Sequence, residues 1–304
     1  MTVSGRVLLG GRDTLPLPGA WAVLHHVVRD SGGPVDSVRT DRGGRYRIRL
    51  SRVDTSAVYV VSAWHGGLAY FSLPLNVIGR PAADVEDLVV YPATKGMPPI
   101  RVARRLLTVA RPGADGTRDV LEILELENTG HTTRISDDTL VPTWTGAIPG
   151  TAIQFQAGQG DISHDALARR GDLVAVLGPI PPGSPKQLSY SYVLPAGTNA
   201  LAVPIDQWTT ELNLLLEDTT AVVTATPLPP ARGVEAIGVQ DIEQRRFAAY
   251  RTGPLEGGAV VTIALPPGGF RAQMALPYVI GLLSATMVAA LVWALRRKPA
   301  LAHR

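Results

Sequence analysis

Cysteine is absent from this sequence of 304 residues. Its absence excludes disulfide bonds, thiolate zinc sites, iron–sulfur ligation and cysteine nucleophiles together. Charged residues are also scarce, at 18 %, whereas hydrophobic residues make up 45 % of the chain. That balance is typical of a chain that buries a core rather than of a disordered one, and the length suffices for about two domains.

Familiar catalytic motifs are absent as well. The six histidines form no H-E-x-x-H pattern, and neither a G-x-S-x-G elbow nor a Walker loop occurs. Carboxylates gather at Asp137 and Asp138 and at Asp161, Asp165 and Asp172, but without the spacing of a calcium loop. We therefore expect no enzymatic activity, no metal and no cofactor, and we expect no small-molecule substrate.

Two local segments resemble sites but have simpler interpretations. His25 and His26 are adjacent in an expected strand, so they point to opposite faces and do not chelate one ion together. Residues 158–165 begin like G-x-G-x-x-G, but Ser163 replaces the third glycine and no long amphipathic helix follows. We expect one histidine to point inward with a hydrogen-bond partner, and residues 158–165 to form a solvated loop.

Positive charge is concentrated at the carboxyl end of the chain. Residues 1–97 carry a net charge of +3, residues 98–270 carry −5, and residues 271–304 carry +5. A nucleic-acid-binding face needs lysines and arginines clustered on a folded surface. The division of charge therefore predicts no nucleic-acid partner.

Period-two alternation dominates the first 270 residues. It is clearest at Arg45–Leu50, where arginines alternate with apolar residues, and it recurs at Leu188–Leu194 and Glu211–Glu217. Frequent Pro and Gly between such runs predict short strands of an all-β fold. Asp115-Gly116 predicts a hairpin with a type I′ turn, and Ser163–Arg170 predicts a short helix capped by Ser163.

The first hundred residues carry a recognisable series of short motifs. They are Gly5-Arg6-Val7, Pro18-Gly19-Ala20, Thr40-Asp41 with Gly44 and Tyr46, and Tyr59-Val60-Val61-Ser62-Ala63. This series resembles the carboxypeptidase regulatory-like domain, a transthyretin-like β-sandwich, over residues 3–92. The resemblance implies a fold and no activity, because this module is an accessory one whose role varies with its attachments.

An uncharged run of 21 residues, Ala275–Leu295, is the strongest single signal in the chain. As a helix it would be roughly 30 Å long, which matches one hydrocarbon core. Aromatic residues near its two ends and basic residues directly after it favour a membrane span. The residues expected to anchor the span at the two interfaces are Tyr278, Trp293, Arg296, Arg297 and Lys298.

Proline-rich segments and this run predict the organisation of the chain. Residues 91–100 contain three prolines, and further Pro/Gly segments fall at 226–233 and 265–270. We expect two antiparallel β-sandwich domains, at residues 1–92 and 101–268, joined by a linker at 93–100. One transmembrane α-helix at 275–295 and a basic tail at 296–304 then follow.

Small side chains lie on one face of the predicted span, at Gly281, Ser284, Ala285 and Val288. Such a face lets a neighbouring helix approach closely in lipid, and ordinary transmembrane composition is the alternative explanation. The basic residues after the span predict a cytoplasmic tail, with the β domains on the periplasmic side of the inner membrane. Residues 1–20 contain no apolar core of a signal peptide, so a tail-anchored protein with cytoplasmic domains is the alternative.

These observations predict a non-enzymatic, single-pass accessory subunit that packs against other subunits of a larger bacterial membrane complex. A photosynthetic reaction-centre–antenna assembly is one concrete case. The alternative is an envelope- or carbohydrate-binding surface module, in which Trp21, Trp64, Trp144 and Trp208 stack on sugars. Tryptophans of a sandwich are more often buried in its core, so we expect these four to be core residues.

Overall fold

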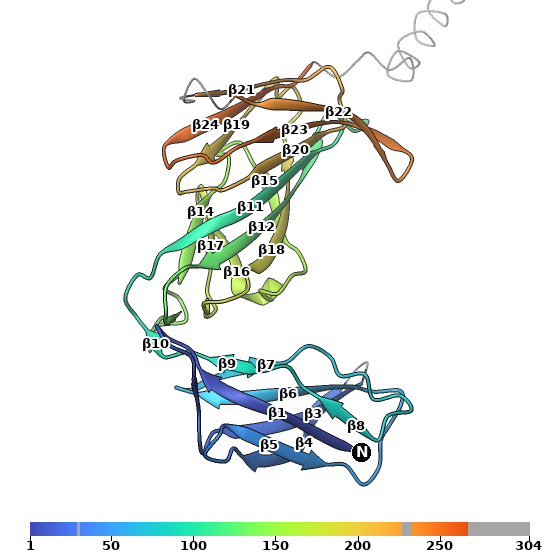
Figure 1. The fold of residues 1–304 in the computed structure, drawn as a ribbon. Helices are drawn as coiled ribbons and strands as arrows, with labels where there is room; N and C mark the ends of the chain where they lie inside the picture. The colour runs from blue at the N-terminus through green and yellow to red at the C-terminus, as the bar shows by residue number, and fades with distance from the viewer. Residues whose placement is uncertain (29–30, 227–232, 267–304) are drawn as a thin grey trace, which may run out of the picture.

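The computed structural model describes residues 1–28, 31–226 and 233–266 (Figure 1). Within these ranges the regular elements are β-strands, apart from one 3₁₀ turn at His164–Ala166, which confirms the all-β prediction. Figure 1 shows two bodies of sheet, and the chain passes from the first to the second near β10. Residues 1–90 are called the N-terminal lobe and residues 93–266 the C-terminal lobe.

The N-terminal lobe consists of two sheets that enclose one apolar core. In the first sheet, β1 (Thr2–Leu9) pairs antiparallel with β2 (Leu15–Pro16) and β5 (Arg45–Arg49), and parallel with β8 (Ala82–Asp84) and β9 (Leu88–Val90). The second sheet is antiparallel throughout, in the order β4 (Ser31–Arg39), β3 (Trp21–Val28), β6 (Val58–His65) and β7 (Leu68–Phe71).

The alternation predicted for β5 is confirmed. Tyr46, Ile48 and Leu50 are buried, and the intervening arginines are exposed. The turn before β5 also follows its sequence, because Asp41 Oδ1 accepts hydrogen bonds of 2.8 Å from the backbone N–H groups of Gly43 and Arg45. Gly44 completes the turn with a φ of +71°, where a side chain is strained.

The C-terminal lobe has a seven-stranded sheet at its centre. Its order is β15 (Ile153–Ala157), β18 (Lys186–Leu194), β12 (Arg118–Asn128), β11 (Ile100–Val109), β20 (Leu212–Leu216), β23 (Arg245–Thr252) and β22 (Glu235–Ile242). Two three-stranded sheets complete the core: β14 (Trp144–Ala147), β17 (Leu173–Val176) and β16 (Leu167–Arg170), and β19 (Ala200–Ile205), β24 (Ala259–Ala264) and β21 (Val222–Thr226).

The β11–β12 hairpin forms where it was predicted, but its turn is not of type I′. A type I′ turn needs positive φ at two central residues, and here Gly116 has a φ of +81° whereas Asp115 does not. Asp115 Oδ1 instead accepts hydrogen bonds from the N–H and hydroxyl groups of Thr117, at 3.0 and 2.7 Å. The side-chain acceptor therefore replaces the tight turn with a longer loop between Val109 and Arg118.

Two other local predictions need correction. Ser163 does cap a turn, accepting from the Asp165 N–H at 3.3 Å, but the turn ends at Ala166 and residues 167–170 form β16. The sheets are also not purely antiparallel, because β8 and β9 run parallel to β1 and β20 runs parallel to β11. Parallel neighbours need long crossover connections, so local turn signals do not reveal them.

The segment predicted as a linker is tied to both lobes. Within it, β10 (Ala93–Thr94) pairs in parallel with β13 (Thr133–Arg134) of the C-terminal lobe. From the N-terminal lobe, the Tyr70 hydroxyl lies 2.8 Å from Thr133 Oγ1 and donates to the Tyr91 carbonyl at 3.0 Å. These contacts fasten the connection between the lobes instead of leaving it free.

Replacing Gly44 with Ala should destabilise the N-terminal lobe more than replacing Gly19 with Ala. Both glycines have positive φ, at +71° and +72°, which costs a residue with a Cβ about 1–2 kcal/mol. A Cβ at Gly44 would also lie 2.4 Å from the Val7 carbonyl oxygen, whereas a Cβ at Gly19 meets nothing within 4 Å. We expect Gly44→Ala to cost about 1–3 kcal/mol more than Gly19→Ala in urea unfolding of the full chain. Equal losses would contradict the steric account of this turn.

Candidate functional site

The residues proposed from sequence as helix-packing and interface positions lie outside the described residues. They are Tyr278, Gly281, Ser284, Ala285, Val288, Trp293, Arg296, Arg297 and Lys298. Over residues 1–28, 31–226 and 233–266, no helix is both long and apolar enough to cross a membrane. The candidate sites below are therefore those of the two lobes.

The two adjacent histidines have separate partners on opposite faces of β3. His25 Nε2 lies 2.8 Å from Ser62 Oγ and packs against Phe71, and partial burial lowers the pKa of His25. His26 Nε2 lies 3.4 Å from Asp54 Oδ2 and packs against Tyr59. The two side chains lie on opposite faces, as alternation along a strand predicts, and the described residues contain no group of three or more potential metal ligands.

The glycine-rich segment at 158–165 is a loop that runs beside β18. The N–H groups of Gly158 and Ile162 donate to the carbonyls of Ser189 and Gln187, at 2.8 and 3.0 Å. A Cβ at Gly160 would lie 2.6 Å from the Gln187 carbonyl oxygen. These glycines therefore allow close approach to a neighbouring strand, and the loop interpretation is confirmed for this segment.

A charged cluster lies inside the C-terminal lobe. Glu122 on β12 has no exposed surface, and Arg105 on β11 is only 4 % exposed. Arg105 Nε donates to Glu122 Oε2 at 2.7 Å, and its Nη1 donates to the Pro204 carbonyl at 3.0 Å. The hydroxyls of Tyr190 and Tyr192 donate to the two Glu122 oxygens at 3.1 and 2.9 Å.

The electrostatics of this cluster follow from burial and from one carboxylate. Burial and the neighbouring Glu122 charge both raise the pKa of Tyr190 and of Tyr192, so these side chains stay protonated as donors. Burial alone would lower the pKa of Arg105, but the Glu122 carboxylate, together with Tyr190 and Tyr192, raises that pKa above its ordinary value. Every member is enclosed and engaged, so we interpret the cluster as structural.

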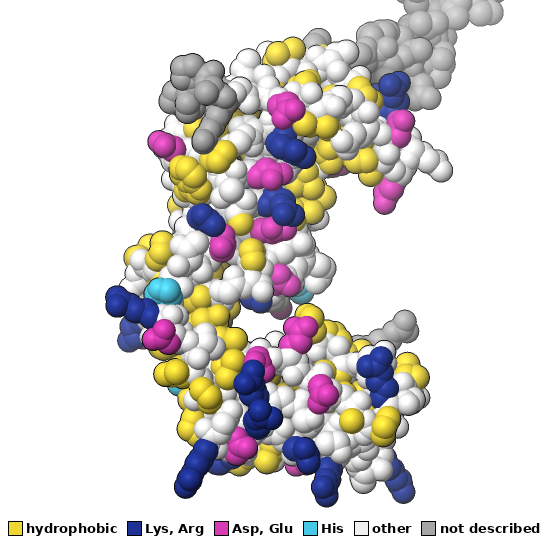
Figure 2. All heavy atoms as spheres, viewed as in Figure 1, with side chains coloured by type: hydrophobic (Ala, Val, Ile, Leu, Met, Phe, Trp, Pro, Cys, Tyr) yellow, Lys and Arg dark blue, Asp and Glu magenta, His cyan; other side chains and the backbone are white. Residues whose placement is uncertain are grey.

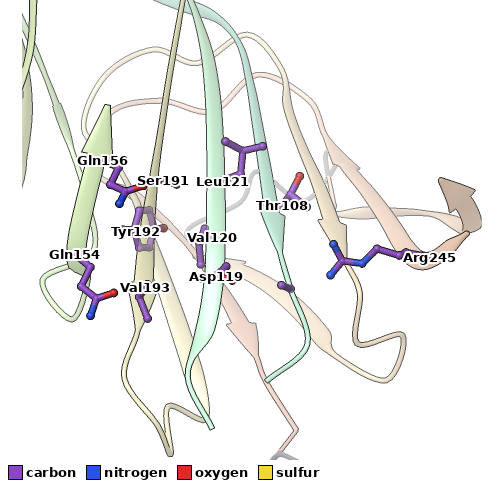
Figure 3. Close-up of a pocket in the computed structure, with 11 residues that line it drawn as sticks. Thr108, Asp119, Val120, Leu121, Gln154, Gln156, Ser191, Tyr192, Val193 and Arg245 are labelled. Carbon is purple, nitrogen blue, oxygen red and sulfur yellow. The ribbon is translucent and has the colours of Figure 1, made fainter. Parts of the chain in front are cut away.

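Hollows occur at the surface of the part of the chain that the structure describes. A trough of about 450 Å³ crosses the outer face of β11, β12, β15 and β18, and Figure 3 shows its lining side chains. Arg245 lies at the margin of this trough, and its guanidinium already binds a carboxylate, because its Nε donates to Glu217 Oε1 at 3.0 Å. A larger hollow of about 1210 Å³ lies between the lobes, walled mainly by residues 69–76, 80–91 and 178–186, and Figure 2 shows it as a notch.

Exposed aromatic side chains gather on the outer face of the second sheet of the N-terminal lobe. Trp21 on β3 and Trp64 on β6 are directly opposite each other and are 44 % and 48 % exposed. Phe71 on β7 is 59 % exposed, and its Cα partner on β6 is Ser62. The Arg39 guanidinium lies over the Trp21 ring, 4.5 Å from its centre, so a cation stacks on one face of that ring. We call Trp21, Trp64, Phe71 and Arg39 the aromatic face.

The expectation that the tryptophans of the two lobes are core residues is wrong for three of the four. Trp144 is buried, at 7 % exposure, whereas Trp208 is 42 % exposed, as Trp21 and Trp64 also are to a similar extent. The sequence did contain the signal for Trp21, because Ala20 and Ala22 point inward and alternation turns Trp21 outward. What the sequence did not reveal is that Trp64 pairs with it.

Exposed aromatic rings on a flat sheet bind through stacking and through release of water from apolar surface. Ring faces of sugars, aliphatic side chains and other aromatic groups all fit such a surface. No protein-family model matches this sequence, and a comparison with curated proteins finds no match. The geometry of the lobes therefore carries the functional argument.

Glu122→Gln should destabilise the C-terminal lobe strongly, since it leaves the Arg105 guanidinium buried without its counter-charge. Breaking a buried pair in this way costs about 3–5 kcal/mol. Glu125→Gln is the matched control, because Glu125 pairs with the exposed Arg104 on the same two strands and such pairs are worth at most about 1 kcal/mol. Chemical denaturation of both variants measures the difference, and similar small losses would show that the buried charge is not essential.

Proposed function

We propose that this chain is a non-enzymatic, membrane-anchored accessory subunit that packs against other subunits of a larger bacterial membrane complex. The observation that carries the proposal is the uncharged run at residues 275–295, which follows the last strand of the C-terminal lobe closely. The buried Arg105 and Glu122 of the C-terminal lobe pair with each other, which favours a structural over a catalytic use. A photosynthetic reaction-centre–antenna assembly is one complex of the proposed kind.

Within this proposal the two lobes are β-sandwich domains followed by one transmembrane helix. The N-terminal lobe is proposed to be a carboxypeptidase regulatory-like domain, supported by the turn at Asp41 and Gly44 and by the inward-pointing Tyr46. The basic residues after the run favour an inner-membrane location with a cytoplasmic tail and periplasmic domains. A tail-anchored arrangement with cytoplasmic domains is the alternative.

The position of Pro266 supports a close connection between the C-terminal lobe and the membrane. Arg118 is buried, and its Nη2 donates to the Pro266 carbonyl at 2.6 Å. Only eight residues separate Pro266 from the start of the run. Eight residues span at most about 30 Å, so the end of the lobe that holds Pro266 would lie near the bilayer surface.

The double variant Gly281→Leu with Ala285→Leu should insert normally but lose its partner subunits. Both changes keep the run apolar, and both place large side chains on the proposed packing face. Ala290→Leu with Ala294→Leu is the matched control, because helical geometry turns these two positions away from that face. Partner recovery is measured by co-purification after mild solubilisation. Equal recovery of subunits with both variants would exclude packing through this face.

The aromatic face supports a second candidate function, binding of envelope carbohydrate. Two opposed and half-exposed tryptophans form a surface on which sugar rings could stack. Arg39 stacks on Trp21 and donates to the Gly19 carbonyl at 2.8 Å, so it holds that ring in place. This candidate needs no pocket, because extended glycans bind to flat surfaces. It is compatible with membrane anchoring, since an anchored module holds its ligand near the bilayer.

If the aromatic face binds glycans, then Trp21→Ala and Trp64→Ala should each weaken binding of the full chain to oligosaccharides by about tenfold or more. A tenfold change corresponds to about 1.4 kcal/mol, which is the order of magnitude that one aromatic contact contributes. Trp208→Ala is the matched control, since Trp208 is similarly exposed but lies in the C-terminal lobe. A glycan array identifies the sugar, and titration calorimetry measures its affinity. Failure of every glycan to bind, or an equal effect of Trp208→Ala, would remove this candidate.

A further inference from the structure

A row of arginines runs along one strand of the N-terminal lobe. Arg45, Arg47 and Arg49 occupy alternate positions of β5, and all three are exposed because the residues between them are buried. Alternate residues of a strand lie about 6.6 Å apart, so the backbone holds three guanidinium groups on one side at regular spacing. Arg42, in the turn before β5, is also exposed.

The arginine row has no acidic partners among the described residues. Its neighbour across the sheet is β1, on which Thr2, Ser4 and Arg6 are paired with Arg49, Arg47 and Arg45. Two carboxylates lie beyond β1 and neither forms an ion pair with the row: Asp87 pairs with Arg6, and Asp84 accepts a hydrogen bond of 2.7 Å from Ser4. Exposed arginines of the C-terminal lobe differ, since Arg101 and Arg104 pair with Glu127 and Glu125.

This arrangement works against the stability of the lobe. Arg6 and Arg45 are directly opposite, and like charges in that position repel each other. Three unpaired positive charges on one strand add to the repulsion at low ionic strength. An external anion would relieve this repulsion, and the planar guanidinium groups favour carboxylate, sulfate or phosphate oxygens.

The position of the row shows which partners can reach it. Figure 1 places β4 and β5 at the margin of the N-terminal lobe that faces away from the C-terminal lobe, and Figure 2 shows dark blue side chains, which in this lobe are all arginines, projecting from that margin. The last strand of the C-terminal lobe, β24, lies at the opposite end of the molecule (Figure 1). If residues 275–295 span a membrane as proposed above, that membrane lies at the far end from the arginine row.

We propose that the arginine row is a binding surface for a linear acidic polysaccharide. Regularly spaced guanidinium groups complement a polymer that carries an oxyanion on successive sugars. The face presents no aromatic side chain beside the row, because its neighbours on β1 are Thr2, Ser4 and Arg6. Proteins that bind single-stranded nucleic acid combine positive charge with aromatic stacking, so an acidic polysaccharide fits this face better.

The experiment measures binding of the full chain, in mild detergent, to polygalacturonate and to heparin by calorimetry. The triple variant Arg45→Gln/Arg47→Gln/Arg49→Gln should weaken binding at least tenfold and should unfold at the same or a higher temperature than wild type. The matched control is Arg101→Gln/Arg104→Gln/Arg251→Gln, which removes the same charge from the C-terminal lobe and should keep wild-type affinity. Affinity of the wild type should fall steeply with added salt.

Three other results would overturn the proposal. One is equal loss with the control triple, which would reduce the effect to net charge. A second is tighter binding to oligo-deoxythymidine or to phosphatidylglycerol vesicles than to either polysaccharide, which would assign the row to nucleic acid or lipid. The third is no binding of either polysaccharide by the wild type. Self-association of the β5 triple variant would then assign the arginines to protecting an edge strand.

Discussion

Glu122 lies on the second strand of the β11–β12 hairpin without any exposed surface, so its charge must be compensated where it lies. The compensation comes from three donors on two other strands, Arg105 of β11 and Tyr190 and Tyr192 of β18. Arg105 also reaches the Pro204 carbonyl of β19, in a different sheet. A slip of one residue between β11, β12 and β18 would leave a buried charge unpaired, so the cluster specifies the register of the C-terminal lobe.

The N-terminal lobe is organised differently, and its polar groups lie mainly at the surface. Its core is apolar apart from a few buried polar side chains such as Ser62, and its turns are shaped by Asp41 and Gly44. Its two sheet faces then present different chemistry, tryptophans on one and arginines on the other. The N-terminal lobe is attached to the C-terminal lobe by hydrogen bonds. The paired strands β10 and β13 lie at this connection, and the Tyr70 hydroxyl contacts Thr133 of β13. The surfaces proposed to bind ligands and the charges that define the strand register thus lie in different lobes.

The sequence predicts the local structure of these lobes well and the long-range pairing poorly. Alternation reveals β5, β18 and β20, because a strand with one buried face must place apolar residues at every second position. It does not reveal that β20 lies parallel to β11, or that Trp64 lies opposite Trp21, since both depend on where distant segments meet. Alternation places Glu122 on the same face of its strand as Val120 and Leu124, so the sequence indicates an inward-pointing carboxylate. The sequence does not indicate that the hydrogen-bond donors come from β18. The arginines of β5 were expected outside, whereas their lack of acidic partners emerged only from the structure.

Hydrogen exchange of the full chain tests most directly whether the buried cluster is the constraint on which the C-terminal lobe depends. The account predicts that backbone amides of β11, β12 and β18 exchange more slowly than those of any other described strand, because their opening requires disruption of the Glu122 cluster. Amides of β22, whose residues are all exposed at the edge of the same sheet, should exchange early. Exchange of β11, β12 and β18 at the same rate as β22 would contradict the account.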